Sequence, residues 1–193
     1  DDLLTRLVEA EVDGEHLGEL ELLRFFQLLL AAGAETTTNL IDNALICLCD
    51  HPEQFEKLRA TPALVPAMLE EVLRFRSPAQ AMFRATKRDV ELHGRTIPAG
   101  KMVLALIGSA NRDARQFTDA NRFDISRDPN PHLAFGHGIH YCLGAALSRL
   151  EARVVFEELL PRLSTIAYAN AAPWPPRKPF HVHGPASLMM KLG

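Results

Sequence analysis

The sequence lacks the features that mark several common classes of protein. It has three cysteines, an odd number with no framework spacing, so a disulfide scaffold is excluded and we expect a reducing, cytoplasmic setting. Its longest uncharged apolar run, Phe25–Ala34, is too short to span a bilayer, and we expect no membrane partner. The formal net charge of −3 gives no reason to expect nucleic acid as a partner.

Helical patterns dominate the first 76 residues. A short first helix ends near Val12, and a long helix over Glu19–Asp50 is apolar on nearly all sides around Leu28–Ala32, which predicts a central, buried helix. Pro52 is typical of the first position of a third helix, which runs to about Ala60. A fourth helix begins at Thr61-Pro62 or at Pro66 and ends before Ser77-Pro78.

Short strands and one more long helix follow. Val90 and Leu92 alternate before a His93-Gly94 turn, and an apolar strand follows the turn at residues 98–100. A loop covers residues 111–140, and a helix runs from Cys142 to about Leu160 with an apolar stripe. The tail is proline-rich and then strand-like. The fold class is therefore mainly α, of the α+β type.

The stretch "HLAFGHGIHYCLGAAL", residues 132–147, contains the densest group of potential ligand side chains in the sequence. Its histidines and cysteine could supply zinc ligands: His132, His137, His140 and Cys142. Structural zinc sites usually bring two short ligand pairs together across a long spacer, whereas these residues crowd one loop, so zinc is the weaker alternative. A buried loop without chemistry is a second alternative.

Glycines around the cysteine favour a third interpretation. Gly136 and Gly138 permit a left-handed backbone and a close approach to another group. At the start of a helix, Cys142 would lie where unpaired N–H groups stabilise a thiolate. Gly144, one turn into that helix, would leave room above the sulfur for something flat. A thiolate held in this way suits an axial ligand of haem iron.

The segment "FGHGIHYCLG", residues 135–144, resembles the haem-binding signature F-G-x-G-x-H-x-C-x-G of the cytochrome P450 haem-thiolate monooxygenases, in their soluble bacterial branch. "AGAETT", residues 32–37, resembles the oxygen-binding motif A-G-x-[DE]-T of that family's central helix. Glu71 and Arg74 match its E-x-x-R, and Arg122 of "NRFD" resembles the arginine that joins them. The resemblance covers residues 1 to about 165.

The resemblance implies a set of site residues. The metal ligand is Cys142, and the cofactor is haem b, iron protoporphyrin IX. The residues implied in binding the cofactor are Ala32, Gly33, Arg84, Phe135, Gly136, His140, Cys142 and Gly144. Arg84 and His140 would bind haem propionates. Glu35 and Thr36 would deliver protons in catalysis, and Glu71, Arg74 and Arg122 would have a structural role.

Two departures from the family pattern are Ala114, where proline is common, and Ser148, where alanine is common. The whole chain, residues 1–193, resembles only the carboxyl-terminal half of the family's fold. The sequence starts at Asp1 in a helix-like pattern without an initiator Met, so we expect further chain upstream.

The resemblance also implies partners and a reaction. They are an electron donor of the ferredoxin or flavodoxin type and a small apolar organic substrate, whose pocket would be lined by residues 78–82 and 185–188. The alternative is a non-catalytic haem-binding or protein-interaction fragment. Because apolar faces would be left uncovered, we expect the isolated chain to self-associate or to pair with its missing half.

Overall fold

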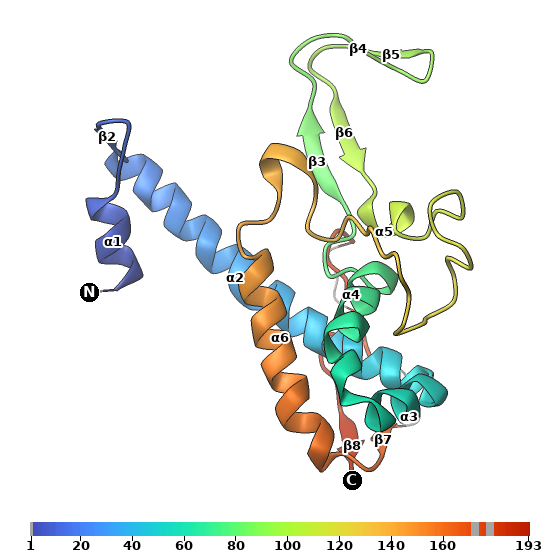
Figure 1. Ribbon diagram of the computed structural model, residues 1–193. Coiled ribbons are helices and arrows are strands. Elements are labelled where there is room, and N and C mark those ends of the chain that lie inside the picture. Colours follow the sequence, from blue (N-terminus) through green and yellow to red (C-terminus); the bar gives the residue numbers. More distant parts are fainter. Residues whose placement is uncertain (1, 171–173, 177–179) are drawn as a thin grey trace. The chain divides into compact units, whose positions relative to one another are not determined.

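The computed structural model describes residues 2–170, 174–176 and 180–193, which are mainly helical (Figure 1). The α-helices of this part of the chain are α1 (Leu3–Glu9), α2 (Glu19–Asp50), α3 (Pro52–Ala60), α4 (Val65–Phe75), α5 (Ile107–Ala110) and α6 (Ala145–Leu159). Short 3-10 helices are η1 (Pro62–Leu64), η2 (Gly138–His140) and η3 (Leu160–Arg162). The mainly α class with small β segments is confirmed.

The strands form antiparallel pairs. They are β1 (Glu11–Val12) with β2 (Glu15–His16), β3 (Met82–Ala85) with β6 (Met102–Ala105), β4 (Val90–Leu92) with β5 (Arg95–Ile97), and β7 (Ile166–Tyr168) with β8 (Met190–Leu192). The predicted turn between β4 and β5 is confirmed, because His93 and Gly94 both adopt positive φ, at 49° and 72°. In the β3–β6 pair, Met82 lies opposite Ala105 and Arg84 opposite Val103.

The chain divides into two compact units, residues 1–35 and residues 36–193, and α2 contributes to both. In the first unit, Asp2 caps α1 by accepting a hydrogen bond from the Thr5 backbone N–H at 2.8 Å. No residue of α1 is buried. Within the described residues, no helix is both long enough and apolar enough to cross a membrane.

The predicted helix bounds are largely confirmed. The long helix spans Glu19–Asp50, and Pro52 opens α3. Both predicted starts of the fourth helix are used, since Pro62 opens η1 and Pro66 lies in the first turn of α4. Proline fits these positions because the first N–H groups of a helix have no internal partner.

The predicted burial of the long helix around Leu28–Ala32 is wrong for this chain. Leu28 and Leu30 are 60% and 62% exposed, and the buried side chains of α2 lie between Thr37 and Leu48. Apolar composition leads to burial only where another element packs on each face of a helix.

The core of the second unit lies among α3, α4, α6 and the last part of α2. Figure 1 shows α4 and α6 with the end of α2 in this unit. The core residues are Leu40, Ala44, Cys47, Leu48, Phe55, Leu58, Val65, Met68, Leu69, Val72, Leu73, Phe123, Ile125, Ala152, Phe156, Leu160 and Leu163. This core fixes the base from which the loop before α6 extends.

Candidate functional site

The loop that precedes α6 presents Cys142 at the surface. Its ends are joined by a hydrogen bond in which the Cys142 backbone N–H donates to the Phe135 carbonyl at 2.9 Å. Gly136 and Gly138 adopt positive φ, at 76° and 71°, as their glycine identity predicted. The Phe135 side chain packs against the core, so the loop is anchored at one end while the thiol stays exposed.

The predicted start of the helix at Cys142 is wrong. The helix α6 begins at Ala145, Gly144 is its N-cap, and the Ala145 N–H donates to the Cys142 carbonyl at 3.2 Å. Gly144 therefore lies at the helix entrance and not one turn inside it. Without a side chain, Gly144 leaves open space at the position where a Cβ would stand, as does Gly138.

The zinc alternative is not supported. No group of three or more His, Cys, Asp or Glu side chains suited to a metal ion exists within the described residues. His132 instead lies 2.9 Å from a Glu70 carboxylate oxygen. Burial raises the pKa of the Cys47 thiol to about 12, whereas Cys142 is exposed. Burial also raises the pKa of the partly buried Cys49 thiol, so Cys142 is the one exposed thiol of the three.

A charged network ties the Cys loop to α4 and α6. Arg149 of α6 donates to both Glu70 oxygens, at 2.7 and 2.9 Å, and to the Tyr141 hydroxyl at 3.2 Å. Its guanidinium also lies 4.4 Å from the centre of the Phe135 ring. Burial alone would raise the pKa of Glu70, but hydrogen bonds from Arg149 and His132 outweigh it and lower that pKa to about 2.

The E-x-x-R pair is fully buried. Arg74 forms two 2.8 Å hydrogen bonds to the Glu71 carboxylate, and both side chains are 0% exposed. Arg74 also donates to the carbonyls of Asn111, Ala120 and Arg122, which joins α4 to the long loop after α5. The structural role predicted for the pair agrees with this geometry.

The assignment of Arg122 as the joining arginine is wrong. Its side chain is 64% exposed and lies 3.9 Å from Asp124, while its backbone carbonyl accepts from Arg74. The side chain that reaches Glu71 is Arg127, at 3.2 Å and 11% exposed. The loop turns so that Arg127 points inward, and a loop without periodicity carries no sequence signal for that direction.

Three residues of the charged network beside the Cys loop were not predicted from the sequence. Glu70, Tyr141 and Arg149 were not identified, although Arg149 is a charged residue beside the apolar stripe of a predicted helix, and this was a signal that could have been used. Their partnership joins residues 79 positions apart, which neither spacing nor periodicity reveals.

The oxygen-motif residues fall on both units. Ala32, Gly33 and Glu35 belong to the first unit, and Thr36 opens the second. The next residue, Thr37, is buried and donates to the Ser148 hydroxyl on α6 at 3.2 Å. The unusual Ser148 therefore has a partner, and Thr36 is one residue from a contact with the helix that follows the Cys loop.

The predicted propionate ligands are exposed. Arg84 lies on β3, where its guanidinium donates to the Phe83 carbonyl at 2.8 Å. His140 ends η2. The two segments expected to line a substrate pocket border different cavities, since Gln80 lines one and Ser187 and Leu188 line another.

Comparison with known proteins identifies the family of this chain. The family model for cytochrome P450 matches residues 63–190. The putative cytochrome P450 YjiB of Bacillus subtilis is 53% identical over 159 residues, which are 82% of this chain and 40% of that protein. The cyclomarin C epoxidase CymV of Salinispora arenicola is 46% identical over 86% of this chain and 42% of its own length.

Solved structures of cytochrome P450 proteins are also similar to this chain. Substrate-free CYP109E1 from Bacillus megaterium is similar with a TM-score of 0.95 and 43% identity, covering 100% of this chain and 50% of that one. The chain belongs to the cytochrome P450 family. It spans about 40 to 50% of the length of these relatives.

Cytochrome P450 proteins bind haem b, and the Cys loop fits that group. It offers one exposed thiol, open space beside Gly138 and Gly144, and apolar side chains left in solvent. Ile139 is 98% exposed and Leu143 is 78% exposed. A flat, largely apolar ligand held through sulfur would cover such a surface.

Proposed function

We propose that the chain is the haem-bearing portion of a monooxygenase, with Cys142 as the iron ligand. The observation that carries this proposal is the exposed Cys142 thiol in a glycine-flanked loop whose ends are joined by the bond from Cys142 to Phe135. Phe135, Gly136, His140, Gly144 and Arg84 would contact the haem. The alternative of a non-catalytic fragment is not favoured, because relatives in the family include an epoxidase and a hydroxylase.

In this function the residues of the chain would have distinct roles. Bound haem supplies the reductive activation of dioxygen. Cys142 would hold the iron, and the Glu70–Arg149–Tyr141 network fixes the loop that carries this cysteine. By resemblance, Ala32 and Gly33 would leave space beside the central helix, while Glu35 and Thr36 would hold and pass protons. The reaction would hydroxylate or epoxidise a small apolar organic substrate.

The electron donor we propose is a small ferredoxin- or flavodoxin-type protein, and the compartment is the cytoplasm, where three cysteines outside disulfides stay reduced. CymV is named for a cyclomarin, and CYP109E1 has been solved with testosterone. These two named compounds differ in kind, so the proposal extends to a substrate class and not to one compound.

Ligation through Cys142 can be tested by spectroscopy. Haem added to the purified chain and reduced under carbon monoxide is expected to give the red-shifted Soret band of thiolate ligation. Cys142→Ala should abolish that band, while the control Cys49→Ala, on α2 and away from the loop, should keep it. An unchanged band in Cys142→Ala would disprove the assignment.

Proton delivery by Thr36 can be tested in a full-length cytochrome P450 that carries this segment. Thr36→Ala should retain haem and substrate binding but divert electrons from product to hydrogen peroxide, because a hydroxyl that holds a proton is lost. The control is Thr37→Val. It removes a hydroxyl that is already bonded to Ser148, so it should not divert electrons to hydrogen peroxide. If Thr36→Ala directs the same share of electrons into product as the parent enzyme does, Thr36 is a core residue only.

A further inference from the structure

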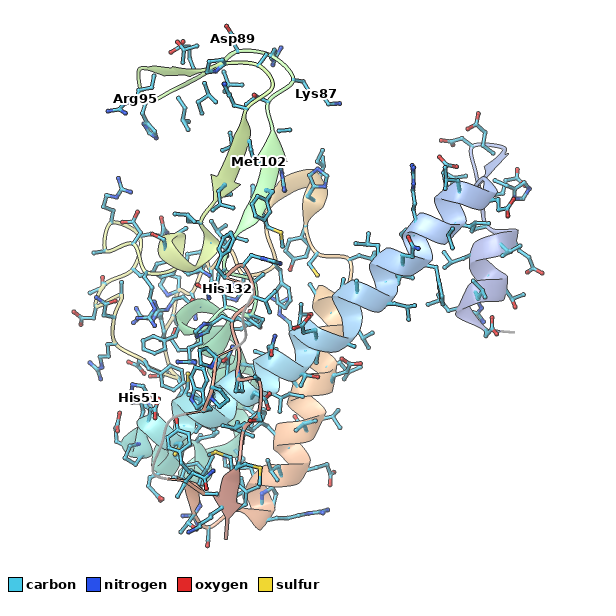
Figure 2. The ribbon with its side chains drawn as sticks, turned by 180° about the vertical axis from the view of Figure 1, so that it is seen from behind. His51, Lys87, Asp89, Arg95, Met102 and His132 are labelled. Carbon is cyan, nitrogen blue, oxygen red and sulfur yellow. The ribbon has the colours of Figure 1, made fainter. Side chains whose placement is uncertain are left out.

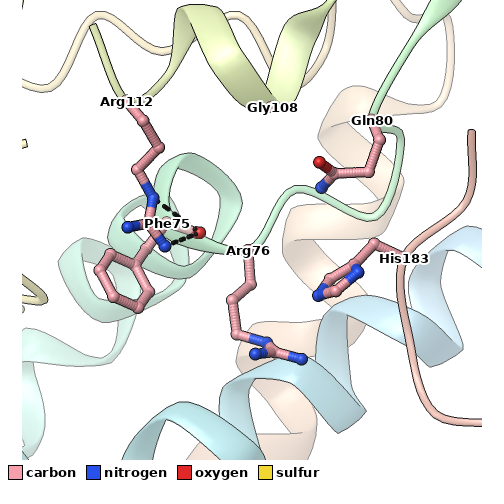
Figure 3. Close-up of a pocket in the computed structure, with 6 residues that line it drawn as sticks. All are labelled: Phe75, Arg76, Gln80, Gly108, Arg112 and His183. Carbon is pink, nitrogen blue, oxygen red and sulfur yellow. Dashed lines mark hydrogen bonds between the residues drawn. The ribbon is translucent and has the colours of Figure 1, made fainter. Parts of the chain in front are cut away.

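A polar cavity lies at the end of α4, away from Cys142 in the sequence. Its volume is about 240 Å³, and it is lined by Phe75, Arg76, Gln80, Gly108, Arg112 and His183 (Figure 3). Pockets for drug-sized ligands have volumes of roughly 300–1,000 Å³, so this cavity suits an ion or an acid of a few atoms.

Arg76 has a donor that the described residues do not satisfy. Its Nε donates to the Asn43 side chain at 3.3 Å, and its guanidinium carbon lies 4.9 Å from the centre of the Trp174 ring. Its Nη2 is buried and has no hydrogen-bond partner among the residues that the structure describes. A buried guanidinium donor without an acceptor is unfavourable, and an anion would relieve it.

Arg112 brings a second guanidinium to the same cavity from the segment after α5. Two hydrogen bonds to the Phe75 carbonyl, at 3.1 and 2.6 Å, hold it in place (Figure 3). Within the described part of the chain, the ion pairs involve neither Arg76 nor Arg112. The Arg112 Nη1 donates to the Asn121 side chain at 3.2 Å, so Arg112 contributes positive charge to the cavity while Arg76 contributes the donor that the described residues leave unsatisfied.

The surroundings keep this volume positive. Glu71, the buried acid nearby on α4, is already paired with Arg74 and Arg127. The sequence after Glu158 contains no aspartate or glutamate, so the segment that carries His183 brings none. Burial lowers the pKa of His183 to about 4, with further lowering from Arg76 and Arg112, so this ring is neutral at pH 7.

We propose that this cavity is a binding site for a small oxyanion, a carboxylate or a phosphate, held by Arg76 and Arg112. Arginine suits both ligands because its planar fork of donors matches their paired oxygens. Gly108 contributes by lacking a side chain, since a Cβ there would overlap the Gln80 amide at the rim. The site is separate from the Cys142 loop and does not depend on haem.

The chain offers its own reporter for the test. Trp174 is its one tryptophan and lies against Arg76. The haem-free chain is titrated at neutral pH with sodium phosphate and with sodium acetate, each against sodium chloride at matched ionic strength. We expect a saturable change in tryptophan fluorescence and a rise in melting temperature with the oxyanions and not with chloride. A response to acetate alone would indicate a carboxylate source, a response to phosphate alone would indicate a phosphate source, and equal responses to both would indicate a general oxyanion site.

Variants make the result specific. Arg76→Gln should weaken oxyanion binding at least tenfold, while Arg115→Gln, which removes a 91% exposed arginine elsewhere, should leave binding unchanged. Should Arg76→Gln fail to fold, Arg76→Lys provides a second test: it keeps the positive charge but removes the planar fork of donors, so it should also weaken oxyanion binding. Equal responses to phosphate and chloride, or unchanged binding in the variant that folds, would overturn the proposal.

Discussion

Glu71 is the residue whose removal should damage this chain most. Its carboxylate accepts from Arg74 and Arg127 and also from the Asp124 backbone N–H at 2.9 Å. Glu71→Gln would leave the buried Arg74 and the largely buried Arg127 without their counter-charge, which costs about 3–5 kcal/mol when a buried pair loses one partner. Chemical denaturation of the haem-free chain measures this loss.

The control for Glu71 is Glu56→Gln. Glu56 pairs with Arg59 on the surface, with side chains 64% and 36% exposed, so its loss should cost less than about 1 kcal/mol. Similar losses in both variants would mean that the buried pair contributes no more than an exposed one.

At the residue scale, the sequence predicted which residues have a structural role better than it predicted which side chains they contact. Glu71 and Arg74 could be paired because i, i+3 residues share a helix face. Arg122 and Arg127 lie in a loop, and their directions depend on turns that bring the backbone of residues 111–122 around Arg74. The spacing of residues within a loop carries no information on side-chain direction, so the sequence pointed to Arg122 where Arg127 makes the contact.

At the scale of elements, the link between α4 and α6 should make stability depend on pH. The pKa of Glu70 is lowered to about 2 from the ordinary 4.5, so its ion pair with Arg149 stabilises the fold above about pH 4.5. That contribution is lost as the pH falls from 4.5 towards 2, because the folded state must then take up a proton at a site that resists it.

Denaturation of the haem-free chain at several pH values tests this link. In Glu70→Gln the decline in stability between pH 4.5 and 2 should be shallower than in the parent chain, whereas Glu158→Gln, at an exposed pair with Arg162, should keep the parent's slope. Parallel slopes in the parent and Glu70→Gln would refute a stabilising role for the pair.

The bounds of helices and strands could be predicted where a single residue type, such as proline or glycine, determines the start of a helix or a turn. Pro52 fixed the start of α3, and His93-Gly94 fixed the turn between β4 and β5. The start of α6 was misplaced because the apolar pattern extends back to Leu143, although residues 141–144 are not helical. Burial was harder still, since it depends on which other elements pack on each face.

At the scale of the whole molecule, α6 shows how much apolar surface remains uncovered. Its buried residues are Ala145, Ala152 and Phe156. The predicted apolar stripe lies elsewhere and is exposed, at 78% for Leu143, 58% for Leu147, 47% for Leu150 and 46% for Val154. Further exposed apolar side chains lie on β6, including Met102 at 71% (Figure 2). The chain spans about half the length of its relatives, so in them this stripe has additional chain available to cover it.

We therefore expect the isolated chain to self-associate through the α6 stripe. Burying one leucine side chain fully contributes about 1.5–3 kcal/mol, so pairing several of them between two copies would drive association. In sedimentation experiments the parent chain should form dimers or larger species, and Leu147→Gln with Leu150→Gln should shift it towards monomer. The control Leu92→Gln changes a leucine on β4 that is equally exposed, at 54%, but lies outside the stripe, so it should leave association unchanged. A parent chain that stays monomeric at all concentrations would show that the stripe does not need a partner.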